Sequence, residues 1–183
     1  MAYNFSDLKK RVKGVEDWLM KEYSGIRTGR ATPSILDNVK IMSYDSLMPI
    51  SQIASITTEG PKSLRVVPWD TSVNKAIEKA IVESNLGLSV VMDEKGVRVM
   101  FPDLTVERRQ SLVKLAKQKL EDARISLRKE RDMTWDDIQK KEEDGVVTED
   151  EKFRLKNEMQ KIVDETSKKL QDMADKKEQE MNN

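Results

Sequence analysis

The sequence contains neither cysteine nor histidine among its 183 residues. The first absence excludes disulfides and thiolate chemistry, and the second removes the commonest general base near neutral pH and the commonest transition-metal ligand. Glycine-rich phosphate-binding loops are also missing, and nothing assembles a nucleophile, a base and an orienting group. We therefore predict a protein that is not an enzyme and has no metal or cofactor of its own.

Long apolar runs and aromatic side chains are scarce as well. Aromatic residues make up 5% of the chain and charged residues 36%. Nothing approaches the roughly 18 consecutive apolar residues of a membrane span, and the first residues lack the apolar core of a signal peptide. We expect a cytoplasmic protein that is rich in solvated helices and has no membrane partner.

The 33 basic and 33 acidic residues cancel overall but are unevenly distributed. Residues 105–131 contain 9 basic and 4 acidic residues, whereas residues 132–183 contain 10 and 16. The zero net charge is thus the sum of opposed blocks. A protein with a local basic segment can bind nucleic acid whatever its overall charge.

Three stretches have the apolar spacing of long amphipathic helices. The first begins near Phe5 and runs for about seven turns, the second covers 105–143, and the third follows a capping box formed by Thr148 and Glu151. Each helix buries only one stripe, so the three must pack together. The predicted stripe of the second helix is Leu112, Ala116, Leu120, Ala123, Leu127, Trp135 and Ile138. That of the third is Leu155, Met159, Ile162, Thr166, Leu170 and Met173, after which the tail is expected to fray.

The segment 31–104 has a different character and interrupts this bundle. Short runs rich in branched residues at 39–42, 53–57, 64–67, 89–92 and 97–101 predict strands, with a helix capped by Ser72. We therefore predict an α+β protein in which residues 1–30 and 105–183 form the bundle and 31–104 form a small inserted domain. The two connections would act as a hinge. The predicted hinge residues are Arg30, Ala31, Thr32, Pro33, Pro102, Asp103, Leu104 and Thr105.

The second helix segregates its charges. Five cations fall within an arc of about 100° beside its apolar stripe, with Arg109 at the edge and Glu121 as the only acid inside. The five are Lys114, Lys117, Arg124, Arg128 and Arg131. They extend over about 25 Å along the helix and match a phosphate backbone, which arginine binds bidentately. A merely solvated helix face is the alternative, and the segregation of sign favours RNA binding through backbone and shape contacts.

Two other classes of protein share some of these features. A coiled-coil scaffold, with or without RNA binding, would explain the helices but would need neither the inserted domain nor the segregated charges. An RNA hydrolase would explain the basic arc, but the sequence lacks histidine and a recognisable acidic metal cluster.

Three segments resemble the ribosome recycling factor family: RTGRATPSILD at 27–37, SNLGL at 84–88 and ERRQSLVKLAKQKLEDARISLRKERD at 107–132. The resemblance spans essentially the whole chain. It implies an L-shaped, tRNA-sized monomer with a long antiparallel three-helix bundle and an inserted β/α/β sandwich. It also implies a translation factor that binds the post-termination ribosome, mainly on large-subunit rRNA. With elongation factor G, which binds the GTP, such a factor would separate the subunits and release mRNA and deacylated tRNA.

The resemblance also selects candidate rRNA-binding residues. They are Arg27, Arg30, Arg109, Lys114, Lys117, Arg124, Arg128 and Arg131. The first two are expected to end the first helix and to extend the RNA-binding surface toward the hinge. The chain departs from the family pattern at three places: at Asp132, where many members carry a second arginine; at Asp45, where many carry glycine; and at Ser89-Val90, where an Asn-Pro is usual.

Overall fold

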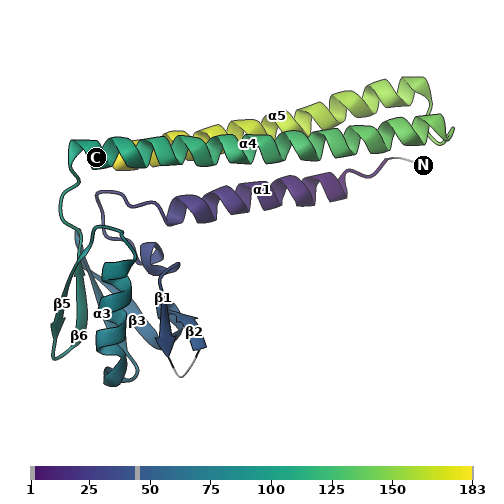
Figure 1. Cartoon of the computed structure of the whole chain (residues 1–183). Coiled ribbons are helices and arrows are strands. Elements are labelled where there is room, and N and C mark those ends of the chain that lie inside the picture. The colour runs from purple at the N-terminus through teal and green to yellow at the C-terminus, as the bar shows by residue number, and fades with distance from the viewer. Residues whose placement is uncertain (1–2, 44–45, 183) are drawn as a thin grey trace. The chain divides into compact units, whose positions relative to one another are not determined.

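The computed structural model describes residues 3–43 and 46–182, and over these residues the chain is α+β. It divides into two compact units. The helical unit contains the chain up to Tyr23 together with Lys114–Glu178. The small unit contains Ser24–Val113 with the residues from Gln179 onward, and it holds all the strands of the described residues (Figure 1).

The small unit extends beyond the predicted range 31–104. It begins at Ser24 and continues to Val113 in the first turns of the second long helix. Side-chain contacts account for part of this extension, because Arg27 and Arg108 both donate hydrogen bonds to backbone carbonyl groups of the small unit. The apolar spacing of the sequence predicts where the helices lie, but it does not predict such side-chain hydrogen bonds.

The helical unit is a three-helix bundle. Its helices are α1 (Ser6–Ser24), α4 (Val106–Glu143) and α5 (Glu149–Asn182). Arg11 of α1 pairs with Glu130 of α4 at 2.6 Å, and Glu22 pairs with Lys119 at 2.9 Å, so these two helices run antiparallel. The short turn after α4 makes α5 antiparallel to α4 (Figure 1).

The bundle core follows the predicted stripes, except that two positions are shifted by one residue and Met173 is only partly buried. Leu120, Ala123, Leu127 and Ile138 are buried on α4, but Thr134 takes the place predicted for Trp135. Thr134 is only 2% exposed because its hydroxyl accepts a hydrogen bond from Arg11 and donates one to the carbonyl of Glu130. On α5, Val163 is buried where Ile162 was predicted.

Two helix ends also differ from the sequence-based expectation. The first helix ends at Ser24, before Gly25, rather than continuing to the predicted arginines. Glycine is a poor helix former, and the residues that follow, Ile26 and Arg27, are buried outside any helix. The last helix was expected to fray near its end, but it remains helical to Asn182.

The small unit is built on two antiparallel sheets. Strands β1 (Lys40–Ser43) and β2 (Ser46–Pro49) form one; the other has the order β3-β4-β6-β5. Its strands are β3 (Ala54–Gly60), β4 (Ser63–Pro68), β5 (Ser89–Asp93) and β6 (Gly96–Met100). The predicted strands are confirmed, whereas β2 was missed. The Asp45 position, in the connection between β1 and β2, lies outside the described residues.

Short helical elements join these strands and close the core. They are η1 (Pro33–Leu36), α2 (Ile50–Ile53), η2 (Thr71–Val73) and α3 (Asn74–Glu83). The helix predicted from Ser72 begins instead with η2, whose cap is Asp70: its carboxylate accepts a hydrogen bond from the backbone nitrogen of Ser72 at 2.8 Å. The core includes Leu64, Val66, Ile77 and Ile81.

Strands β5 and β6 form a hairpin, with Asp93 opposite Gly96. Gly96 has φ +125°, and a Cβ there would come within 2.5 Å of the carbonyl oxygen of Val66. This turn therefore requires glycine. Ser89-Val90, one of the departures from the family pattern, simply begins β5, opposite Met100 and Val99.

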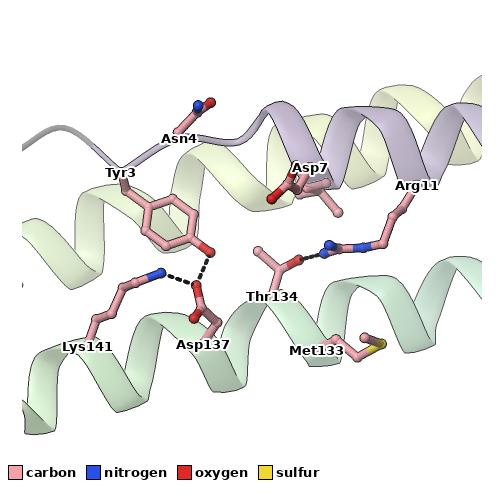
Figure 2. A pocket seen from close by; sticks show the side chains of 9 residues that line it. Tyr3, Asn4, Asp7, Arg11, Met133, Thr134, Asp137 and Lys141 are labelled. Carbon is pink, nitrogen blue, oxygen red and sulfur yellow. Dashed lines mark hydrogen bonds and ion pairs between the residues drawn. The ribbon is translucent and has the colours of Figure 1, made fainter.

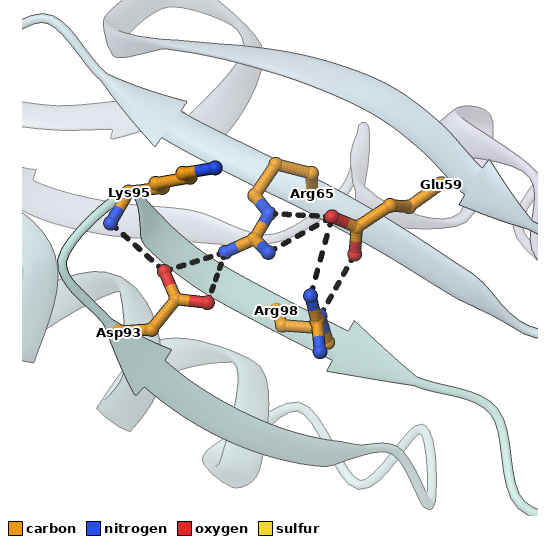
Figure 3. A network of polar contacts seen from close by, with 5 residues as sticks. All are labelled: Glu59, Arg65, Asp93, Lys95 and Arg98. Atoms are coloured by element: carbon orange, nitrogen blue, oxygen red, sulfur yellow. Dashed lines mark hydrogen bonds and ion pairs between the residues drawn. The ribbon is translucent and has the colours of Figure 1, made fainter.

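Arg65 forms a charged network on the face of the four-stranded sheet that is opposite the core (Figure 3). Its side chain is 9% exposed, and its guanidinium donates to Asp93 at 2.5–2.6 Å and to Glu59 at 2.8–3.1 Å. Arg98 donates to the same Glu59 at 2.8 Å. The hydrogen bonds from Arg65 hold the pKa values of Asp93 and Glu59 below their usual range. The network thus ties β3, β4, β5 and β6 together.

We expect this network to make folding of the small unit pH-dependent. A carboxyl group with a depressed pKa stabilises the fold above its unfolded-state pKa, and that contribution is lost as the pH falls through the folded-state value. In thermal unfolding, Arg65→Met should lower the melting temperature at pH 7 and flatten the loss of stability below about pH 4. Lys95→Met is the matched control, because only the backbone nitrogen of Lys95 bonds to Asp93. An unchanged melting temperature for Arg65→Met would contradict this role.

Candidate nucleic-acid interface

The cations of the basic arc lie beside the buried stripe of α4. We call five of them the basic face: Lys114, Lys117, Arg124, Arg128 and Arg131. All belong to the helical unit. Their exposure follows from the register of the helix, since Ala116, Ala123 and Leu127 point into the core. Lys117 is 66% exposed and Arg128 51%, while Arg124 and Arg131 are 39% and 38% exposed, so every one of these four can reach an external ligand.

Four of the five cations have acidic partners within the molecule. Lys117 pairs with Glu178 of α5 at 3.5 Å, and Arg128 pairs with Glu121 at 2.8 Å. Lys114, by contrast, takes part in none of the ion pairs found among the described residues. Such exposed pairs contribute about 0–1 kcal/mol, which is little enough for a phosphate to replace the carboxylate.

Arg124 and Arg131 also have acidic partners. Arg124 lies 3.8 Å from Glu121, and Arg131 pairs with Asp132 at 2.7 Å. Asp132 is one of the three positions at which the resemblance implies a departure from the family pattern, and it places an acid directly against a cation of the basic face.

Arg109 and Arg30 lie in the small unit. Arg30 is exposed, and its backbone nitrogen contacts the hydroxyl oxygen of Thr28 at 3.5 Å. Arg109 is partly buried and donates to the carbonyl oxygen of Met181. Thr105 caps the start of α4, since its hydroxyl accepts a hydrogen bond from the backbone nitrogen of Arg108 at 3.2 Å.

Arg27 is not at the surface. It is 5% exposed, and its guanidinium donates to the carbonyl oxygens of Leu86, Gly87 and Pro102. The ring of Phe101 lies 5.6 Å from the centre of the guanidinium, close enough for a cation–π contact. Burial lowers the pKa of Arg27 from its ordinary value, with the nearby charge of Arg108 as a second cause. This arrangement favours a structural role over the predicted RNA contact, and also over capping of α1, which ends at Ser24.

The contacts of Arg27 explain why SNLGL accompanies RTGRATPSILD. Gly87 has φ +68°, and a Cβ there would approach the Arg27 Nη1 atom to 3.2 Å, so glycine allows the guanidinium to reach the Gly87 carbonyl, 2.6 Å away. Arg108, from the third segment, donates to the carbonyl of the neighbouring Asn85 at 3.1 Å. The three segments that carried the family resemblance therefore meet inside the small unit.

The predicted hinge residues all fall within the small unit. Ala31 belongs to its core and donates a backbone hydrogen bond to Pro61 at 2.8 Å. Asp103 pairs with Lys62, whose hydrogen bond lowers the pKa of that carboxyl. The hinge stays a prediction, and these contacts attach parts of both connections to the small unit.

A second candidate site is a polar cavity of about 470 Å³ in the helical unit. Figure 2 shows Tyr3 and Lys141 both directed at Asp137, with Oδ2 distances of 2.6 and 2.5 Å, and Arg11 directed at Thr134. These hydrogen bonds lower the pKa of Asp137, and burial, with the bond to Asp137 as a second cause, raises that of Tyr3. Asp137 and Lys141 pair with each other and Arg11 bonds to Thr134, so most of the polar lining has a structural explanation.

Some features contribute to the fold but were missed from sequence. Arg65, Arg11 and Gln171 are polar residues whose partners lie far along the chain, and no local pattern identifies them. Over the described ranges 3–43 and 46–182, no group of histidine, cysteine or acidic side chains could hold a metal ion. Within those same ranges, none of the helices combines the length and apolarity that a membrane crossing requires.

Comparison with known proteins identifies the family. The sequence model described as "Ribosome recycling factor" matches residues 19–181. The ribosome-recycling factor of Zymomonas mobilis is 41% identical over 180 residues, covering 98% of this chain and 97% of that one. The factor of Endomicrobium trichonymphae is 41% identical over 177 residues, covering 97% and 95%.

Two solved structures agree with this assignment. A ribosome recycling factor in solution matches with a TM-score of 0.75 and 31% identity, covering 99% of this chain and 98% of that one. The Thermus thermophilus factor, described with Escherichia coli elongation factor G on the E. coli post-termination complex, matches with a TM-score of 0.69 and 36% identity, covering 97% and 96%. The chain belongs to the ribosome recycling factor family and is a non-catalytic factor of translation.

Proposed function

We propose that this protein binds the ribosome after termination and, together with elongation factor G and GTP, separates it into subunits, releasing mRNA and deacylated tRNA. The proposal is supported by the full-length similarity to ribosome recycling factors, one of which has been described on the post-termination complex with elongation factor G. The sequence contains no phosphate-binding loop, so GTP would be bound by the partner. The protein would act as a monomer in the cytoplasm, where the ribosome is found.

The basic face of α4 would supply the affinity for the ribosome, chiefly through large-subunit rRNA. The observation that carries this proposal is the segregation of exposed cations beside the buried stripe of one helix. Each cation that meets a phosphate releases condensed counterions, which gives affinity without reading the base sequence. Arg30 and Arg109 are further candidates, whereas Arg27 is not, because its guanidinium is buried.

The small unit would transmit the action of elongation factor G. The connections at 30–33 and 102–105 lie within this unit and would be where it bends, and the hydrogen bonds of Arg27 to Gly87 and Pro102 would limit how far it does so.

Subunit separation tests the function as a whole. Post-termination ribosomes incubated with this protein, elongation factor G and GTP should sediment as free subunits. Reactions that lack any one of the three should leave ribosomes intact. Subunit separation that is equally complete without this protein would contradict the proposal.

Charge reversal on α4 tests the basic face. Arg128→Glu should weaken ribosome binding by about tenfold, because a phosphate contact is replaced by repulsion. Arg154→Glu on α5 is the matched control, since Arg154 is also exposed but lies outside the basic face. Binding is measured by cosedimentation at fixed salt, and both variants should keep the wild-type melting temperature. Equal binding by the two variants would defeat the assignment of this face.

Arg27 provides a test of structure against RNA contact. Arg27→Met should destabilise the small unit by about 2–3 kcal/mol, because the carbonyl groups of Leu86, Gly87 and Pro102 lose a charged donor. Arg30→Met is the control and should leave stability almost unchanged, since its side chain is exposed. Urea unfolding measures both effects. If Arg27→Met lost ribosome affinity at unchanged stability, the RNA-contact role expected from sequence would be restored.

A further inference from the structure

Two carboxylates contact arginines of the basic face, and they do so in different ways. A single oxygen of Asp132, Oδ1, accepts from both Nε and Nη2 of Arg131, at 2.9 and 2.7 Å. These two N–H groups form one of the forks with which a guanidinium binds a phosphate. Asp132 therefore occupies the donors that an RNA phosphate would use.

Glu121 bridges two arginines and occupies few of the N–H donors of either one. Its Oε1 accepts from Nη2 of Arg128 at 2.8 Å, and its Oε2 lies 3.8 Å from Nη1 of Arg124. A guanidinium has five N–H donors, so most donors of both arginines stay available for a ligand. The hydrogen bond from Arg128 holds the pKa of Glu121 below its usual range, so the carboxylate is ionised at neutral pH.

The bridge is anchored on a second helix. Arg124 donates from Nη2 to the carboxamide oxygen of Gln171 on α5 at 2.6 Å. The Gln171 nitrogen in turn donates to Asp175 at 2.6 Å, which fixes the orientation of the carboxamide. A continuous series of polar contacts thus runs from Arg128 through Glu121, Arg124 and Gln171 to Asp175, entirely within the helical unit.

We propose that Glu121 is a positioning residue that holds Arg124 and Arg128 ready for RNA phosphates, while Asp132 is a competitor that must be displaced from Arg131. The inference rests on the proposed function of the basic face. A free arginine loses side-chain entropy when a ligand immobilises it, and a side chain that is already restrained loses less. Glu121 would therefore raise affinity for an anion despite its own negative charge.

This inference predicts effects of opposite sign for two chemically identical changes. Glu121→Gln and Asp132→Asn each convert one carboxylate of α4 into a carboxamide. If charge alone mattered, both would strengthen binding to RNA. Positioning instead predicts that Glu121→Gln weakens ribosome binding about threefold, whereas Asp132→Asn strengthens it by about the same factor. Gln171→Met isolates geometry, because it removes the anchor of Arg124 without changing any charge, and it should also weaken binding.

The experiment measures the affinity of the full-length variants for post-termination ribosomes at fixed salt, with melting temperatures to verify folding. Arg128→Gln is included to test the basic face itself. Unchanged affinity of Arg128→Gln would defeat the RNA-binding face. Weaker binding by Arg128→Gln combined with unchanged or tighter binding by Glu121→Gln would overturn only the positioning role.

Discussion

The buried stripe of α4 dictates where the charged side chains of that helix can lie. Ala116, Ala123 and Leu127 face the core, so a helix of constant period must present the adjoining positions at one edge of this stripe. Those positions are occupied by the basic face, and its cations are therefore aligned along a rigid element. The same packing that stabilises the bundle thus spaces the charges that we propose contact rRNA. Glu121 and Gln171 refine this arrangement by restraining individual arginines within it.

Arginine serves two different purposes in this molecule. At the basic face it is partly exposed and forms weak surface ion pairs with carboxylates. At Arg27 and Arg65 it is buried and acts as a hub, joining backbone carbonyls in one case and acidic side chains of the sheet in the other. Exposure distinguishes the two uses, and sequence alone does not reveal it. A functional role inferred from an arginine in a family motif therefore needs this structural check.

The long helices and most strands could be predicted because they depend on local spacing. The α4 boundaries, the capping box at Thr148 and the hairpin at Gly96 all follow from neighbouring residues. The features that were missed depend on distant partners. Thr134 is buried because Arg11 donates a hydrogen bond to it, and Arg27 is buried because the carbonyls of Leu86 and Gly87 accept its hydrogen bonds. The basic face was foreseeable as a pattern of charge, but the different geometries at Glu121 and Asp132 were not.

The salt dependence of ribosome binding tests the central claim most directly. Binding through phosphate contacts makes the logarithm of the affinity fall linearly with the logarithm of the salt concentration, and each lost contact reduces the slope by about one. A variant with Lys114, Arg124, Arg128 and Arg131 all changed to glutamine should show a slope smaller by roughly four. A slope equal to that of the unaltered protein would contradict the claim that this face of α4 contacts RNA.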